Sequence, residues 1–147
     1  MSNRKIKNIV KIMVFGTFDG LHSGHLDFFK QAKSLSTESF LTVSIARDKN
    51  VKKIKNKFPK LKEKERFALV LGCNLVDKVV LSGIKNHILH ILREAPQIIA
   101  LGYDQRAYVK NLKKDLAKKG LKVKIIRLKP YKNHVYKNHL LKKRLRI

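Results

Sequence analysis

The sequence of 147 residues has one cysteine, three prolines, no tryptophan and only 10 Asp and Glu residues against 35 Lys and Arg residues. The single cysteine, Cys73, excludes a disulfide framework within the chain and a cysteine-based zinc site. No apolar run approaches the roughly 20 residues that a membrane-spanning helix needs. Residues 1–11 are basic and lead into a strand pattern rather than into a cleavable apolar segment, so we expect a cytoplasmic protein.

The scarcity of acidic residues leaves a formal charge of +25 at pH 7. Such an excess attracts polyanions through long-range electrostatics and counterion release. Nucleotides, nucleic acid and anionic membrane surfaces all fit this description, and a lysine-rich genome is an alternative cause without a function. The end of the chain, residues 129–147, is a basic segment that we include in a single domain spanning residues 1–147.

Short apolar, β-branched runs alternate with amphipathic helical patterns along the chain, which is typical of βαβ units. The strand-like runs are residues 9–15, 40–46, 78–81, 97–101 and 123–128. We therefore predict an α/β fold, a Rossmann-like doubly wound domain with a mostly parallel, five-stranded sheet. In such sheets ligands bind beyond the carboxyl ends of the strands, which directs attention to the residues after each run.

Residues 13–29, MVFGTFDGLHSGHLDFF, pass from an apolar run through a turn rich in Gly and His into an amphipathic pattern. Gly16 lets the backbone leave the strand, and Gly24 allows a ligand to approach bare backbone at the start of the helix. A helix N-terminus presents unpaired N–H groups and a partial positive charge, which favour phosphate. His22 and His25 are three residues apart, so we predict that they share one helical face and bind one phosphate. Two surface polar residues or a metal-binding pair are the alternatives.

The stretch GTFDGLHSGH, residues 16–25, resembles the signature G-x-F-D-x-x-H-x-G-H of the cytidylyltransferase-like nucleotidyltransferases. The resemblance covers roughly residues 9–128, and Gly-Tyr-Asp-Gln at 102–105 is most similar to archaeal-type FAD synthases, which are FMN adenylyltransferases. The same framework is similar to glycerol-3-phosphate cytidylyltransferase. The resemblance implies transfer of a nucleoside monophosphate from ATP or CTP to a phosphorylated small molecule, with release of pyrophosphate and with Mg²⁺ as the divalent cation.

The resemblance also implies roles for individual residues. His22 and His25 would hold the triphosphate and stabilise charge as pyrophosphate leaves, while Lys55 and Arg66 would be further catalytic residues. The other expected nucleotide contacts are Gly16, Thr17, Phe18, Gly24, Gly102, Tyr103, Asp104, Asn138 and His139. The expected acceptor contacts are Asp19, Asp48, Lys52 and Lys53, with Asp19 also a candidate ligand of Mg²⁺.

Several of these residues have a purely structural alternative. Asp19 can cap a turn, Arg66 can form a surface ion pair, and the residues of 102–105 can simply serve the turn in which they lie. The lysines between 52 and 55 can be a solvated run. These alternatives stay open at the level of the sequence.

The chain departs from the family pattern near its C-terminus. Relatives carry a Ser/Thr-rich segment that binds the β and γ phosphates, whereas residues 131–141 contain neither Ser nor Thr. Asn138 and His139 are the candidates to replace the missing hydroxyls. The basic segment 129–147 motivates a second hypothesis, in which transferase activity has faded and the chain binds RNA or another polyanion. A homodimer is one open oligomeric state, because relatives often pair.

Overall fold

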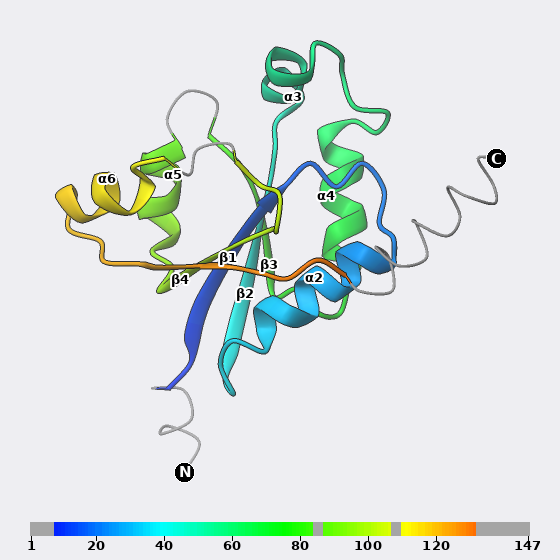
Figure 1. Cartoon of the computed structure of the whole chain (residues 1–147). Helices are drawn as coiled ribbons and strands as arrows, with labels where there is room; N and C mark the ends of the chain where they lie inside the picture. The colour runs from blue at the N-terminus through cyan, green and yellow to red at the C-terminus, as the bar shows by residue number, and fades with distance from the viewer. Residues whose placement is uncertain (1–7, 84–86, 107–109, 132–147) are drawn as a thin grey trace.

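The computed structural model describes residues 8–83, 87–106 and 110–131. Strands and helices alternate along these residues, as the sequence predicts (Figure 1). The strands are β1 (Val10–Gly16), β2 (Ser39–Ile45), β3 (Lys78–Leu81), β4 (Ile98–Leu101) and β5 (Lys124–Arg127). The helices are α2 (Ser23–Lys33), α3 (Asp48–Lys55), α4 (Glu63–Leu71), α5 (His87–Glu94) and α6 (Leu112–Lys118).

The five strands form one sheet in the order β3-β2-β1-β4-β5, and each neighbouring pair is parallel. From the central strand β1 the chain first builds β2 and β3 on one side, and then crosses to build β4 and β5 on the other. The predicted doubly wound, five-stranded parallel sheet is therefore confirmed. The point where the direction of winding changes lies between β1 and β4, which is where such sheets open a crevice for ligands.

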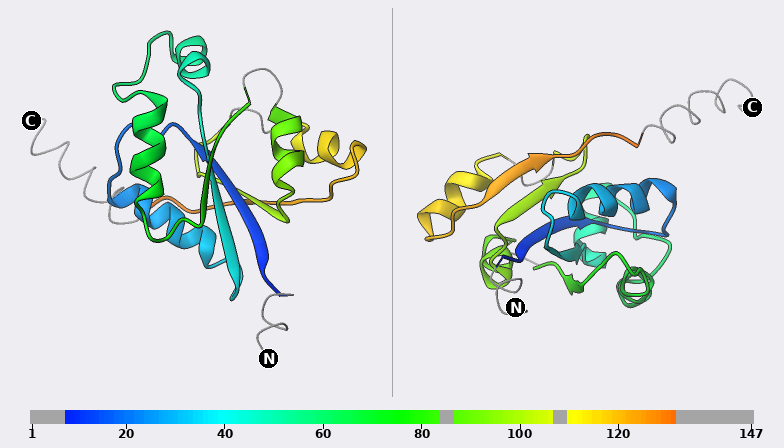
Figure 2. Two further views of the ribbon diagram at one scale, coloured as in Figure 1. Left: turned by 180° about the vertical axis from the view of Figure 1, so that it is seen from behind. Right: turned by 90° about the horizontal axis from the view of Figure 1, so that it is seen from below.

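The core lies on both faces of the sheet, because successive side chains of a strand point to opposite faces. Ile12 and Val14 of β1 belong to the cluster packed against α2 and α4, whereas Met13 belongs to the cluster packed against α5 and α6. Figure 2 shows α5 and α6 side by side, away from α2 and α4. The buried helix residues in these clusters include Phe29, Ala32, Val70, Ile91, Leu112 and Leu116.

Burial on both faces explains why the central strands are nearly continuous apolar runs. In β2, every residue from Leu41 to Ile45 is buried, including Thr42 and Ser44. None of the helices in the described part of the chain is long and apolar enough to cross a membrane.

Candidate active site

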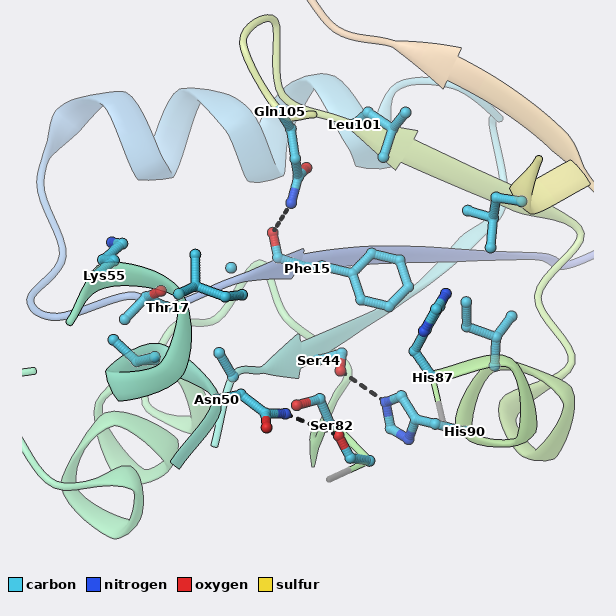
Figure 3. A pocket seen from close by; sticks show the side chains of 17 residues that line it. Phe15, Thr17, Ser44, Asn50, Lys55, Ser82, His87, His90, Leu101 and Gln105 are labelled. Atoms are coloured by element: carbon cyan, nitrogen blue, oxygen red, sulfur yellow. Dashed lines mark hydrogen bonds between the residues drawn. The ribbon is translucent and has the colours of Figure 1, made fainter. Parts of the chain in front are cut away.

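Three cavities with shared walls lie at the carboxyl ends of the strands. The first, which we call the apolar cavity, has a volume of about 210 Å³ and extends from Phe15 to Leu112 of α6 (Figure 3). The other two are wider grooves of about 620 Å³ and 550 Å³ that both border His22 and His25. Thr17 after β1 and Lys55 at the end of α3 line all three cavities.

We name the two grooves by the residues that distinguish them. The lysine groove includes Lys57 and Lys60, and the tyrosine groove includes Tyr103 and Tyr131. Each groove shares Thr17 and Lys55 with the apolar cavity. The three spaces therefore form one branched crevice with a common junction.

The turn after β1 is shaped by a contact between Gly16 and Phe18. Phe18 has a left-handed backbone with φ of 54°, and only 5% of the residue is exposed. Its ring centroid lies 5.4 Å from those of His25 and Phe29. A Cβ atom on residue 16 would lie 2.6 Å from Cζ of Phe18, which is closer than two carbon atoms can pack. Because residue 16 has no side chain, the Phe18 ring can pack in an edge-to-face contact with the ring of His25.

The two signature histidines cap the start of α2. Nδ1 of His22, the N-cap residue, accepts the backbone N–H of Gly24 at 3.0 Å, and Nδ1 of His25 accepts the backbone N–H of His22 at 3.2 Å. The two rings are stacked with centroids 3.9 Å apart. Because each Nδ1 accepts a hydrogen bond, the neutral rings carry their protons on Nε2, which makes these atoms donors. A pair of donors at a helix N-terminus suits a bound phosphate.

The turn after β4 is fixed from two sides. Oε1 of Gln105 accepts the N–H of Gly102 at 3.2 Å, and Nε2 of Gln105 donates to the carbonyl of Phe15 at the end of β1, also at 3.2 Å. From β5, Nη1 of Arg127 donates to the carbonyls of Gly102 at 2.8 Å and Gln105 at 2.9 Å. Tyr103, which is 50% exposed, is thereby held at the wall of the tyrosine groove.

Asp19 anchors the segment that forms the lysine groove. Its carboxylate accepts the backbone N–H groups of Lys60 at 2.7 Å and Leu61 at 2.8 Å, and these bonds, that from Leu61 first, lower the pKa of Asp19. In residues 8–83, 87–106 and 110–131, no group of three or more His, Cys, Asp or Glu residues could hold a metal ion. Both carboxylate oxygens of Asp19 accept backbone N–H groups in this structure, which supports the turn-capping alternative, and its role as a ligand of Mg²⁺ stays a prediction.

Arg66 lies under the crevice and is fully buried, with 0% of the residue exposed. Its Nη1 donates to the carbonyls of Thr17 and Ala46, both at 2.8 Å, and its Nε donates to the carbonyl of Leu61 at 3.0 Å. Its Nη2 forms an ion pair with Asp48 at 2.6 Å. In this structure the guanidinium of Arg66 is engaged within the protein, where it joins the ends of β1 and β2 to α4, and the catalytic role that the resemblance implies for Arg66 stays a prediction.

Asp48 is also engaged inside the protein. One carboxylate oxygen pairs with Arg66, and the other accepts the backbone N–H of Glu63 at 3.2 Å. Glu63 returns a bond, since its Oε1 accepts the N–H of Asp48 at 2.8 Å. Asp48 thereby ties the start of α3 to the start of α4, and its predicted contact with an acceptor stays a prediction.

The predicted lysines have separate positions on α3. Lys52 lies over the ring of Phe58, with Nζ 5.7 Å from the ring centroid, and Lys53 is exposed outside these three cavities. Lys55 alone of the three lines the cavities. Asn138 and His139 lie outside the described residues, as does the basic segment 129–147 beyond Tyr131, so their predicted roles stay predictions.

Sequence reasoning did not find the polar residues of the apolar cavity. Ser44 and His90 are buried, and Ser44 Oγ lies 2.7 Å from Nε2 of His90. His87, three residues earlier on α5, lines the same cavity. Burial lowers the pKa of both His87 and His90, so both rings are neutral at pH 7. The signal in the sequence was the spacing of three residues between His87 and His90, which places two side chains on one face of a helix.

Residues 13–142 match the family model described as Cytidylyltransferase-like. The chain belongs to the cytidylyltransferase-like family. It is 44% identical over 111 residues to an FAD synthase of Korarchaeum cryptofilum, and the matched region covers 75% of this chain and 75% of the relative. An FAD synthase of Methanosarcina barkeri is 42% identical over 112 residues, covering 76% of this chain and 78% of the relative. The recognition made from residues 16–25 is confirmed.

A solved structure of a cytidylyltransferase-like fold is also similar. It is the lipopolysaccharide core biosynthesis protein of Thermoplasma volcanium, with a TM-score of 0.76 and 34% sequence identity. The match covers 83% of this chain and 98% of that protein. The fold of this chain is therefore similar to the fold of that protein over most of both chains.

The contact between Gly16 and Phe18 generates a first prediction. We expect Gly16→Ala to lower the free energy of unfolding by about 1–3 kcal/mol, because its Cβ overpacks a buried ring. The control is Gly72→Ala, whose Cβ would lie at an ordinary 3.5 Å from the carbonyl of Leu69. Urea unfolding of both variants measures the difference, and equal stability would contradict the steric account.

The buried guanidinium generates a second prediction. We expect Arg66→Met to lower the free energy of unfolding by about 3–5 kcal/mol, because it leaves Asp48 and three carbonyls without their partner. Arg93→Met, at an exposed position of α5, is the matched control and is expected to change stability by less than about 0.5 kcal/mol. A loss below about 1 kcal/mol in urea unfolding of Arg66→Met would argue against a positioning role.

Proposed function

We propose that the chain transfers AMP from ATP to FMN, forming FAD and releasing pyrophosphate. The observation that carries this proposal is the branched crevice, in which two grooves beside a histidine pair meet an apolar cavity at Thr17 and Lys55. A phosphate-binding space joined to an apolar space fits two phosphorylated substrates of which one carries a large ring. The similarity to archaeal FAD synthases supports the same activity.

The nucleotide fits the tyrosine groove. His22 and His25 border this groove at the N-terminus of α2, and the turn 102–105 forms its opposite wall. The triphosphate would lie against the histidines and the bare backbone at Gly24, with the base near Gly102 and Tyr103. ATP is preferred over CTP in this proposal because the similar relatives are FAD synthases.

The acceptor fits the apolar cavity. Phe15, Ile91 and Leu101 offer apolar contact to a flat ring, and Lys55 at the junction can neutralise the phosphate that the acceptor carries. Glycerol-3-phosphate has no ring and would make few apolar contacts with the lining of this cavity. The shape and lining of the cavity therefore favour FMN among the acceptors that the family resemblance leaves open.

The reaction needs positioning more than acid–base chemistry. A phosphate monoester has its second pKa at about 6, so the FMN phosphate is already ionised at pH 7. One of its oxygens attacks the α-phosphorus of ATP, and a new P–O bond forms. The bond from the α-phosphorus to the bridging oxygen breaks, and pyrophosphate leaves with the electron pair. Donors from His22 and His25 and the charge of Lys55 stabilise the negative charge that shifts onto the leaving oxygens.

Mg²⁺ enters this proposal as part of the ATP substrate. The ion prefers phosphate oxygens and retained water, with one or two carboxylates at most. The described residues supply no carboxylate cluster at the junction. In this proposal the ion arrives with the phosphates of ATP, and the lysines and histidines of this chain act on those phosphates.

The substrate pair is tested by measuring pyrophosphate release from MgATP and MgCTP, each with FMN and with glycerol-3-phosphate. We expect release only from ATP with FMN, together with FAD identified by its mass. Release from CTP with glycerol-3-phosphate alone would overturn the assignment of both substrates.

The histidine pair generates a further prediction. We expect His25→Ala to lower kcat by about 10²–10³, the usual effect of removing one donor to a transition-state oxyanion. His22→Asn separates catalysis from capping, because Asn is a good N-cap residue but lacks the imidazole donor. It should lose activity and keep its melting temperature.

The matched control for these variants is Lys30→Ala, at an exposed position in the last turn of the same helix. It should leave kcat within a factor of two of the unmodified protein. An unchanged kcat in a folded His25→Ala variant would remove the histidine from the mechanism.

A further inference from the structure

The apolar cavity has one buried polar pair in its wall. Ser44 is 1% exposed and His90 is 6% exposed, and both line the cavity. Figure 3 shows the bond of 2.7 Å between Ser44 on β2 and His90 on α5, below the ring of Phe15. The two residues come from elements far apart in the sequence, so the fold brings them together.

The pair can adapt to a ligand because a hydroxyl both donates and accepts hydrogen bonds. With the proton of His90 on Nδ1, the Ser44 hydroxyl donates to Nε2 and keeps lone pairs for a ligand N–H. With the proton on Nε2, His90 donates to Ser44, whose hydroxyl hydrogen can then reach a ligand carbonyl. The Ser44 hydroxyl can therefore act toward a ligand as a hydrogen-bond acceptor or as a hydrogen-bond donor at the same position.

The cavity around the pair suits a flat ring with one polar edge. Phe15, Ile91 and Leu101 are apolar neighbours in its lining. The ring system of a flavin has an apolar dimethylbenzene end and a pyrimidine edge that carries two carbonyls and one N–H group. A ring with that edge gains a hydrogen bond to the pair that a wholly apolar ring cannot make, so the wall favours a ring with a polar edge.

We propose that Ser44 and His90 together determine specificity for the acceptor, with the Ser44 hydroxyl bonding the polar edge of a flat heteroaromatic ring and His90 holding that hydroxyl in place. This inference rests on the proposed function, which assigns the acceptor to the apolar cavity. It adds the chemical feature of the acceptor that is recognised and the residues that recognise it. His90 is a positioning residue in this account, because it acts through Ser44.

The first test compares KM for FMN with KM for MgATP in Ser44→Ala. We expect KM for FMN to rise about tenfold, the effect of losing one hydrogen bond of ordinary strength, with kcat and KM for MgATP within a factor of two. Ser44→Thr, which keeps the hydroxyl, should restore most of the affinity for FMN. A role confined to folding predicts instead a lower melting temperature with unchanged KM values.

A second variant and a matched control distinguish a loss of recognition from a loss of folding. His90→Gln keeps a group able to bond Ser44 and should raise KM for FMN less than His90→Phe does. Leu89→Ala, at an exposed position of the same helix, should leave both KM values unchanged. Equal KM values for FMN in Ser44→Ala, His90→Phe and the unmodified protein would overturn the inference and leave the proposed activity in place.

Riboflavin separates the two proposals, because it has the ring but no phosphate and cannot accept AMP. Its binding is followed by quenching of its fluorescence. If the unmodified protein makes no FAD, the proposed function fails, and the titration still decides the inference. Binding weakened about tenfold by Ser44→Ala supports recognition of the ring edge, whereas equal binding, or no binding to the unmodified protein, overturns it.

Discussion

One buried guanidinium, that of Arg66, holds the crevice in shape. It bonds the carbonyls that follow β1 and β2, the carbonyl before α4, and the carboxylate at the start of α3. A buried charge without partners would be strongly destabilising, so each of these segments is fixed relative to the same group. Thr17 carries one of those carbonyls, and Lys55 ends the helix that Asp48 begins. The junction of the cavities thus depends on a side chain that is itself fully buried.

The few acidic residues have mainly structural uses. Asp19 fixes the lysine groove, Asp48 and Glu63 join α3 to α4, and Asp77 and Glu94 pair with Lys33 and Lys78. Most lysines are left on the surface without a carboxylate partner in the described part of the chain. A positive field around the crevice accelerates the approach of anionic substrates, and salt screens that effect beyond about 8–10 Å.

The strands and the turn after β1 could be predicted because local pattern decides them. Alternation of apolar runs indicated the sheet, and the spacing of Gly16, His22 and His25 indicated a phosphate-binding helix start. The helix α3 was treated as a lysine run, because Val51 is its only buried residue and leaves no apolar stripe. The internal partners of Arg66 and Asp48 could not be predicted, since sequence spacing does not tell whether a charged side chain points into the crevice or beneath it.

Contacts between segments that are far apart in the sequence could not be predicted, for a different reason. Arg127 is one of 35 basic residues, and only the pairing of β5 with β4 brings it to the carbonyls of the turn 102–105. Ser44 lies between two apolar residues of β2, with no sequence signal for a partner. His90 became its partner because α5 packs against the same face of the sheet as the end of β2.

The shared junction at Thr17 and Lys55 has a kinetic consequence. Under the proposed function, the two substrate spaces share Thr17 and Lys55, so the acceptor phosphate and the α-phosphorus can meet directly, with both substrates bound at once. Such an arrangement corresponds to a sequential mechanism with a ternary complex, in which initial-rate plots at several acceptor concentrations intersect rather than run parallel. The product then spans both spaces as one molecule, and its departure empties the whole crevice in a single step.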